Sequence, residues 1–256
     1  MADKGLKGKL ALVTGSTSGI GLGMAKALAQ RGCNLVINGF GDQAEIDRLV
    51  KSLGDTHGVK AVFEAADLSK VADTEQLMKR CAQVHGGVDI LVNNAGVTRS
   101  KPLLDEDEDD WDHVVGINAR GAFLVATGAA REMVAAGRRG SIINIASILG
   151  LRQAKQVASY AISKAGLLQM TKVMALELAR FGIRVNSLCP GYVSTELNQE
   201  FLEGAAGKAL LQRIPQRRVG SLQDLDGPLL LLASDASLFM TGAELVIDGG
   251  HVMASL

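Results

Sequence analysis

Residues 14–21 read Thr14-Gly15-Ser16-Thr17-Ser18-Gly19-Ile20-Gly21, and this stretch decides the fold. It follows the apolar run 10–13 directly and opens a helical pattern that continues to about residue 31. Glycine lets backbone N–H groups approach a ligand closely, and the start of a helix attracts phosphate. A glycine triplet alone is weak, but its position between a strand and a helix is typical of a dinucleotide-binding turn. We therefore expect Gly15, Gly19 and Gly21 to cradle a pyrophosphate.

The alternation of strand and helix patterns continues along the chain. Short apolar runs look like buried strands at residues 10–13, 34–37, 61–63, 89–92, 141–145, 184–188 and 244–247. Helical patterns separate them over about 20–31, 43–54, 72–85, 106–136, 158–181 and 223–234. This order predicts an α/β fold with a parallel sheet covered on both faces. We expect one domain over residues 1–256, with a mobile substrate loop at 193–220, where the alternation fails.

Composition excludes several classes of protein. The chain has 256 residues, of which 47% are hydrophobic, and a formal net charge of zero, so it can bury a core and offers no basic footprint for nucleic acid. Its three cysteines lack a Cys-x-x-Cys pair, which indicates a reducing compartment. No signal-peptide core or membrane-spanning run is present. We expect a cytoplasmic protein without membrane or nucleic-acid partners.

The acidic run 105–110, Asp-Glu-Asp-Glu-Asp-Asp, has two interpretations. It could hold a cation, or it could be the first turn of a helix, where acids complement the helix dipole. Trp111 and Val115 would then begin the buried face, and this second interpretation is the better one. The four histidines show no ligand spacing, so we expect no metal site.

Tyr160 and Lys164 form a second informative pair, because a spacing of four stacks two side chains on one helix face. An ammonium beside a phenol favours the phenolate and lowers the tyrosine pKa from about 10 toward neutrality. Such a tyrosine can exchange a proton with a substrate oxygen. The pair is common on solvated helices, but here Ser147 ends a strand-like run just upstream. Together with the glycine turn, these residues indicate a redox enzyme.

The spacing Gly-x-x-x-Gly-x-Gly, the segment 93–96 (Asn-Asn-Ala-Gly) and the set Ser147, Tyr160, Lys164 resemble the classical short-chain dehydrogenase/reductase family over essentially the whole chain. The resemblance implies a single-domain Rossmann fold, with a doubly wound parallel sheet of seven strands, a nicotinamide cofactor and usually a homotetramer. The positions that would contact the cofactor are Gly15, Ser16, Thr17, Ser18, Gly19, Ile20, Gly21, Phe40, Asp67, Leu68, Asn94, Ala95, Gly96, Tyr160, Lys164, Pro190, Gly191, Val193 and Thr195.

The resemblance also implies reversible hydride transfer between the cofactor and a secondary alcohol or ketone. Tyr160 would exchange the proton with the substrate oxygen, and Ser147 would hydrogen-bond that oxygen. Lys164 would lower the Tyr160 pKa and bind the nicotinamide ribose. Asn118 matches a position that anchors a water relay to the lysine, although it could instead satisfy backbone groups in a buried helix. The cofactor carries the difficult chemistry, so no metal is required.

The choice between NAD and NADP depends on residues near the ribose. A ribose phosphate would call for Arg or Lys near the glycine turn or just beyond the second strand. Neither residues 16–18 nor residues 38–42 (Asn-Gly-Phe-Gly-Asp) offer one, which favours NAD. The acid expected at the strand end is replaced by Asn38-Gly39, so NADP stays open.

The substrate prediction depends on positions in the second half. The first hundred residues resemble bacterial 3-hydroxybutyrate dehydrogenases, but their polar carboxylate-binding positions are Thr98, Leu149, Val157 and Tyr192 here. A buried carboxylate would lack partners among these residues. From about residue 103 onward the chain is more similar to oxoacyl reductases and sugar dehydrogenases. Ile148, Leu149, Val157 and Tyr192 would form a mainly apolar pocket, which favours an apolar or aromatic ketone or a 3-oxoacyl compound.

Several alternatives stay open: 3-hydroxybutyrate dehydrogenase, 3-oxoacyl-carrier-protein reductase and sugar dehydrogenase. A basic patch for an acidic carrier protein could use Arg138 and Arg139, but Phe181 stands where a second basic position is expected. A non-catalytic dinucleotide-binding sensor is an alternative of another class. Such a protein would typically lack Tyr160 or Lys164, and both are present.

Overall fold

The computed structural model describes residues 5–254, and its centre is a parallel sheet. The strands are β1 Leu10–Val13, β2 Asn34–Ile37, β3 Ala61–Phe63, β4 Ile90–Asn93, β5 Gly140–Ile145, β6 Ile183–Pro190 and β7 Glu244–Ile247. They pair in the order β3-β2-β1-β4-β5-β6-β7. Because β1 pairs with β2 on one side and β4 on the other, the switch point of the topology lies between β1 and β4. Ligands of such sheets bind at the carboxyl ends of the strands near this point.

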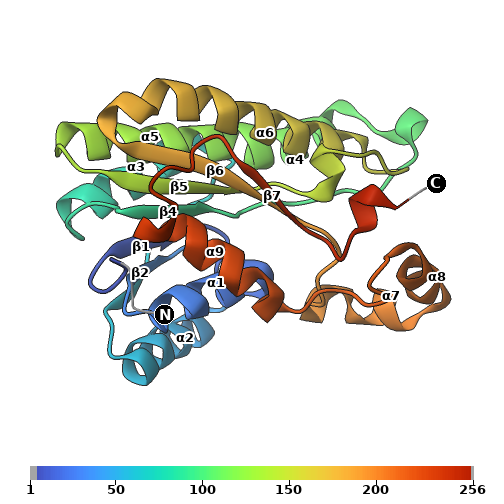
Figure 1. The fold of residues 1–256 in the computed structure, drawn as a ribbon, viewed down its shortest axis with the longest axis horizontal. Coiled ribbons are helices and arrows are strands. Elements are labelled where there is room, and N and C mark those ends of the chain that lie inside the picture. Colours follow the sequence, from blue (N-terminus) through green and yellow to red (C-terminus); the bar gives the residue numbers. More distant parts are fainter. Residues whose placement is uncertain (1–4, 255–256) are drawn as a thin grey trace.

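Helices cover both faces of the sheet (Figure 1). The α-helices are α1 Gly19–Ala29, α2 Gln43–His57, α3 Val71–Gln83, α4 Glu108–Val115, α5 Ala122–Ala135, α6 Ala158–Leu178, α7 Gln199–Glu203, α8 Ala205–Arg213 and α9 Asp226–Ala233. Helices α3, α4, α5 and α6 lie on one face, and α1, α2 and α9 lie on the other. Shorter helical turns are η1 Leu103–Asp105, η2 Gly116–Gly121, η3 Ile148–Gly150, η4 Ala179–Phe181, η5 Glu196–Asn198, η6 Leu222–Leu225, η7 Asp235–Ser237 and η8 His251–Met253.

Two apolar cores flank the sheet, one under each layer of helices. Val13 of β1 packs in the core that contains Leu28 of α1 and Leu229 of α9. Its neighbour Leu12 packs in the other core, with Leu77 of α3. Successive strand residues point to opposite faces, so a strand covered on both sides must be apolar throughout. This explains the continuous apolar runs in the sequence.

The predicted helix 106–136 is not one regular helix. The structure divides it into α4, a π-helical turn at Gly116–Gly121 and α5. A π-helical turn contains one extra residue, which the apolar pattern of the sequence does not reveal. Close packing accompanies the turn, since a Cβ on Gly121 would stand 2.5 Å from the Leu68 carbonyl oxygen.

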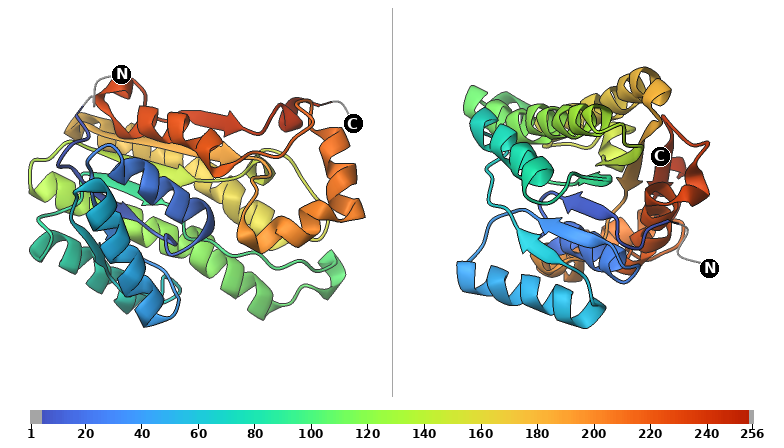
Figure 2. Two further views of the ribbon diagram at one scale, coloured as in Figure 1. Left: turned by 90° about the horizontal axis from the view of Figure 1, so that it is seen from below. Right: turned by 90° about the vertical axis from the view of Figure 1, so that its left-hand side faces the viewer.

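The segment 193–220 contains η5, α7 and α8, beyond the carboxyl ends of the strands and close to the C-terminal segment (Figures 1 and 2). A parallel bridge between Val193 and Gly220 closes its base. The Gln216 amide donates a hydrogen bond to the Gly249 carbonyl oxygen at 3.1 Å. The segment is therefore anchored at both ends, and its mobility stays a prediction. Among residues 5–254, no helix combines the length and apolar character that crossing a bilayer requires.

Candidate active site

A cleft of about 590 Å³ opens at the carboxyl ends of β1, β2, β4, β5 and β6. It brings together most of the predicted cofactor residues: Gly15, Thr17, Ser18, Gly19, Ile20, Gly21, Phe40, Asp67, Leu68, Asn94, Ala95, Gly96, Tyr160, Lys164, Pro190, Gly191 and Thr195. Ser16 and Val193 do not line it, because both are buried beneath the cleft surface. The cleft also has lining residues that the sequence did not single out: Asn38, Gly39, Ala66, Val97, Ile117, Ile145 and Ala146.

The glycine turn has the shape of a phosphate cradle. A Cβ on Gly21 would stand 2.1 Å from the Gly15 carbonyl oxygen, so only glycine lets the turn close on itself. Ser18 precedes α1 without donating or accepting a side-chain cap, and no acid lies in the first turn. The free N–H groups and the positive end of the helix dipole are therefore available to an anion. These residues fit the pyrophosphate of a dinucleotide.

Asn94 joins the segment after β4 to the glycine turn. Its Nδ2 donates hydrogen bonds to the carbonyl oxygens of Thr14 at 2.9 Å and Gly15 at 3.0 Å. The Thr14 hydroxyl in turn accepts from the amides of Asn94 and Ala95, both at 3.0 Å. Asn94 thus shapes the cleft by fixing two loops that come from neighbouring strands.

The adenosine end of the cleft lies after β2 and β3. The Asn38 side chain faces away from it, donating to the carbonyl oxygens of Glu64 at 3.1 Å and Ala66 at 3.2 Å. Phe40 is 73% exposed beside Asp67, whose pKa is lowered mainly by the hydrogen bond from the Ser69 hydroxyl. Lys164 is the one cation among the described residues that line the cleft. It donates to the last residue of β5, and two strands, β1 and β4, separate β5 from β2. No cation lines the adenosine end of the cleft itself, and the Lys70 ammonium beside it forms an ion pair with Asp67 at 3.5 Å.

The catalytic residues meet at the other end of the cleft. Ser147 directly follows β5 and Ala146, while Tyr160 and Lys164 lie on α6. The Lys164 ammonium lies 5.6 Å from the centroid of the Tyr160 ring and donates to the Ile145 carbonyl oxygen at 2.8 Å. The Ser147 hydroxyl acts on Tyr160 by hydrogen bonding. The end of β5 and the helix α6 thus present a hydroxyl, a phenol and an ammonium to one space.

Asn118, in the π-helical turn, supports this group from behind. Its Oδ1 accepts from the Val97 amide at 2.8 Å, and its Nδ2 donates to the Val97 carbonyl oxygen at 2.8 Å and to the Ser163 hydroxyl at 3.1 Å. A Cβ on Gly96 would stand 3.2 Å from the Asn118 Oδ1 and 3.4 Å from the Lys164 Nζ. The amide and the ammonium therefore flank the same glycine, although Asn118 itself is buried.

The ionisation of the pair differs from the prediction made from its spacing. Lys164 is 4% exposed, and this burial lowers its pKa to about 8. Burial raises the pKa of Tyr160, while the Ser147 hydrogen bond opposes this and the charge of Tyr192 adds to it. The pKa of Tyr160 in this structure is thus shifted in the direction opposite to the one predicted from its spacing with Lys164. The catalytic role of Lys164 stays a prediction.

The predicted substrate residues occupy different environments. Ile148 is 5% exposed and belongs to the interior, while Leu149, Val157 and Tyr192 are half-buried. The Leu149 amide donates to the Ser147 hydroxyl oxygen at 3.1 Å. Tyr192 faces Tyr160 closely enough for its charge to act on the phenol. None of the four lines the cleft, so the structure does not gather them into one pocket.

His251, in the turn after β7, is a neighbour that the sequence did not identify. Its ring lies 5.9 Å from the Tyr192 ring, centroid to centroid. Its Nδ1 is buried without a hydrogen-bond partner. Only the position of His251 after Gly249-Gly250 could have pointed to it. Within the described residues, no group of His, Cys, Asp and Glu is arranged to hold a metal ion.

Known proteins similar to the chain share its full length. A family model described as "Enoyl-(Acyl carrier protein) reductase" matches residues 15–252. The 2-dehydro-3-deoxy-D-gluconate 5-dehydrogenase of Escherichia coli K12 is 39% identical over 246 residues, which are 96% of each protein. The D-beta-hydroxybutyrate dehydrogenase of Cupriavidus necator is 38% identical over 258 residues, 96% of this chain and 99% of that protein.

Solved structures agree with these matches. A gluconate 5-dehydrogenase from Burkholderia cenocepacia, in complex with NADP and tartrate, is 38% identical with a TM-score of 0.92 and full coverage of both chains. A short-chain type dehydrogenase/reductase from Mycobacterium marinum is 37% identical with a TM-score of 0.89, covering 96% of each chain. These likenesses confirm the predicted single-domain α/β fold.

Proposed function

This chain belongs to the short-chain dehydrogenase/reductase family of NAD(P)-dependent oxidoreductases acting on CH–OH groups, and we propose that it is a secondary-alcohol dehydrogenase/ketone reductase that prefers NAD. One observation carries the proposal: the Ser147 hydroxyl, the Tyr160 phenol and the Lys164 ammonium meet at the end of a cleft that fits a dinucleotide. A bound nicotinamide would supply the hydride acceptor or donor. The chain supplies the proton and the hydrogen bonds.

Tyr160 is the proposed acid and base. Its phenol would donate a proton to the substrate oxygen during reduction, and its phenolate would accept the alcohol proton during oxidation. Ser147 would donate a hydrogen bond to the same oxygen and fix its position. The lowered pKa of Lys164, about 8, suits a group that passes a proton to and from its neighbours near neutral pH.

Asn118 would anchor a water at the inner end of this proton path. Both N–H groups of its side chain are used, by Val97 and Ser163. Its Oδ1 accepts a hydrogen bond from the Val97 amide, and an amide oxygen has two lone pairs. The second lone pair, close to Lys164 across Gly96, can accept a bond from water.

The preference for NAD is argued from charge. The Burkholderia relative binds NADP. In this chain the adenosine end offers the carboxylate of Asp67 and the exposed ring of Phe40, with no Lys or Arg among the cleft residues around them. A ribose phosphate placed there would meet only Lys70, whose ammonium is already paired with Asp67 at 3.5 Å. We expect NAD to bind at least about tenfold more tightly than NADP, a difference of about 1.4 kcal/mol.

The substrate we propose carries a hydrogen-bonding group close to the reacting carbon. The His251 ring lies 5.9 Å from the Tyr192 ring, centroid to centroid, and its Nδ1 is buried without a hydrogen-bond partner. Buried polar groups require partners, so a substrate that provides one should bind better. A 3-oxoacyl compound and a hydroxylated ketone both provide such a group. Leu149 and Val157 do not line the cleft, so a simple aryl ketone, which would need an apolar pocket, is the second candidate.

We also propose a homotetramer in the cytoplasm. Large apolar side chains are exposed in two regions, with Phe123 and Leu176 on α5 and α6, and Phe239 and Val246 at and before β7. Burying them between subunits would remove apolar area from water. Sedimentation at low protein concentration would reveal a monomer if this is wrong. The buried thiols suit a reducing compartment, since burial raises the pKa of Cys81 to about 12 and of Cys189 to about 11.

The test is absorbance at the reduced-nicotinamide band, with a panel of ketones and alcohols and each cofactor in parallel. The panel contains 3-hydroxybutyrate, an acetoacetyl thioester, hydroxylated ketones and an aryl ketone. Tyr160→Phe should bind cofactor normally while kcat falls by orders of magnitude. Normal turnover by this variant would refute the catalytic role. Cofactor binding without turnover of any compound by the wild type would favour the non-catalytic sensor.

A further inference from the structure

The helix that carries Tyr160 begins without a cap of its own. The residue before α6 is Val157, which has no side-chain acceptor, and the first turn contains no acid. Gln156, one residue earlier, adopts a φ of 66°, a conformation that non-glycine residues rarely accept. The first amides of a helix need partners from outside the helix. The start of α6 must therefore be held by another part of the chain.

Glu106 holds it from 53 residues away in the sequence. The Ser159 amide donates a hydrogen bond to the Glu106 Oε1 at 3.2 Å. A second contact from the same segment lies beside it, because the Lys101 amide donates to the Gln156 carbonyl oxygen at 3.0 Å. A carboxylate at this end of a helix also complements the helix dipole. The residue next to Ser159 is Tyr160, so any shift of the capped turn moves the phenol.

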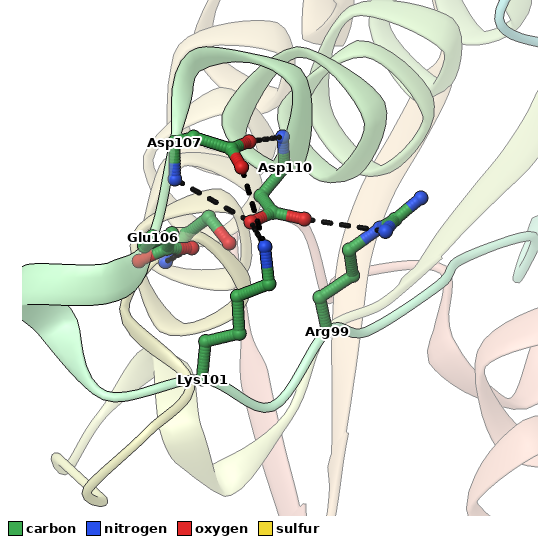
Figure 3. A network of polar contacts seen from close by, with 6 residues as sticks. Arg99, Lys101, Glu106, Asp107 and Asp110 are labelled. Atoms are coloured by element: carbon green, nitrogen blue, oxygen red, sulfur yellow. Dashed lines mark hydrogen bonds and ion pairs between the residues drawn. The ribbon is translucent and has the colours of Figure 1, made fainter.

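The segment that carries Glu106 is itself fixed. Figure 3 shows Arg99 and Lys101 converging on the carboxylate of Asp110, which is 2% exposed. The Arg99 ion pair measures 3.2 Å, and Lys101 also contacts Asp107 at 3.3 Å. Asp107 and Asp110 bond reciprocally to each other's amides at the start of α4. A carboxylate on such a braced segment can position another helix.

We propose that Glu106 is a positioning residue for Tyr160, acting as the cap that α6 lacks. This inference rests on the proposed function, in which Tyr160 exchanges the substrate proton. Glu106, a member of the acidic run 105–110, would then cap α6, whereas Asp107 and Asp110 cap α4. Glu106 is not among the residues that line the cleft, so its effect should appear in kcat and leave cofactor binding alone.

Three variants test the proposal. Glu106→Ala removes the acceptor, and Glu106→Gln keeps an oxygen that can accept from the Ser159 amide. Glu108→Ala is the matched control, because Glu108 is an exposed acid of the same run with no bond to α6. We expect kcat to fall by about tenfold to a hundredfold in Glu106→Ala, the scale of an ångström-sized misplacement of a reacting group. Glu106→Gln should recover most of the loss, and the Kd for NAD should be unchanged throughout.

Amide hydrogen exchange in the first turn of α6 separates this inference from the proposed function. The Ser159 amide should exchange faster in Glu106→Ala, and at the wild-type rate in Glu106→Gln and Glu108→Ala. Slow exchange in Glu106→Ala would overturn the capping role whether or not any substrate is found. A normal kcat with fast exchange would overturn the link to Tyr160. A loss in Glu106→Gln equal to that in Glu106→Ala would overturn the role of the hydrogen bond.

Discussion

Replacing Lys164 with methionine should stabilise the folded protein at pH 7, although it removes a proposed catalytic group. Lys164 is 4% exposed, and its burial lowers the pKa from 10.5 to about 8. This pKa shift, 10.5 − 8 = 2.5, means that burying the charged form of Lys164 destabilises the folded state by about 3 kcal/mol. Methionine removes this cost and has a similar length.

The net gain is smaller, because the ammonium also donates to the Ile145 carbonyl oxygen at 2.8 Å. Leaving that oxygen unpaired costs about 1 kcal/mol. We therefore expect the free energy of unfolding to rise by about 2 kcal/mol at pH 7. In a domain of this size, that corresponds to an increase in Tm of about 4–8 °C.

The gain should depend on pH in a fixed direction. Because the pKa of Lys164 is lower in the folded state than in the unfolded state, the unfolded chain binds more protons between about pH 8 and 10.5. The wild type therefore gains stability as pH rises through this window, and the advantage of methionine disappears. Urea denaturation of both proteins without added nucleotide, at several pH values from 7 upward, measures this. Lys155→Met, in an exposed loop, is the control. Equal stabilities at pH 7, or an advantage that does not shrink with pH, would refute the reasoning.

Three further predictions concern the cleft. Gly21→Ala should abolish NAD binding in a fluorescence titration, since its methyl group would stand 2.1 Å from the Gly15 carbonyl oxygen. Gly166→Ala is the control and should bind NAD normally, because nothing lies within 4 Å of its added methyl group. Tight NAD binding by Gly21→Ala would contradict the phosphate cradle. Phe40→Arg, which places a cation at the exposed adenosine end, should strengthen NADP binding by roughly tenfold, and an unchanged Kd would remove the charge argument. Asn118→Leu leaves the N–H and carbonyl groups of Val97 unpaired, so the free energy of unfolding measured by urea denaturation should fall by about 2–4 kcal/mol. A denaturation midpoint equal to that of the wild type would show that those groups find other partners.

The sequence predicted the strands well because each buried strand is a short apolar run. The ranges 10–13, 34–37, 61–63 and 244–247 agree with β1, β2, β3 and β7. The helix predicted over 106–136 was the least accurate, since apolar periodicity does not show where one extra residue enters a turn. The type and order of the helices and strands follow from local sequence patterns, whereas an extra residue within a helix depends on tertiary packing.

The candidate site divides in the same way. The glycine turn and the set Ser147, Tyr160, Lys164 are visible as motifs, and the structure brings them to one cleft. The direction of the Tyr160 pKa shift could not be predicted from spacing, because burial is its largest cause. Glu106 and His251 were missed for a different reason. Their partners, Ser159 and Tyr192, are far away in the sequence and share no motif with them.

The π-helical turn at Gly116–Gly121 sets the rotation of α5 relative to α4, the two helices that it joins. Each added or removed residue rotates everything downstream by about 100° around the helix axis. Val114 of α4 and Val125 of α5 are both fully buried, so deleting one residue from the turn would rotate one buried face by about 100° relative to the other. Deleting one residue here would give a more regular helix and a worse protein, with the alanine-rich face of α5 turned away from the sheet. In the π-helical turn, the number of residues is therefore constrained more tightly than the type of residue.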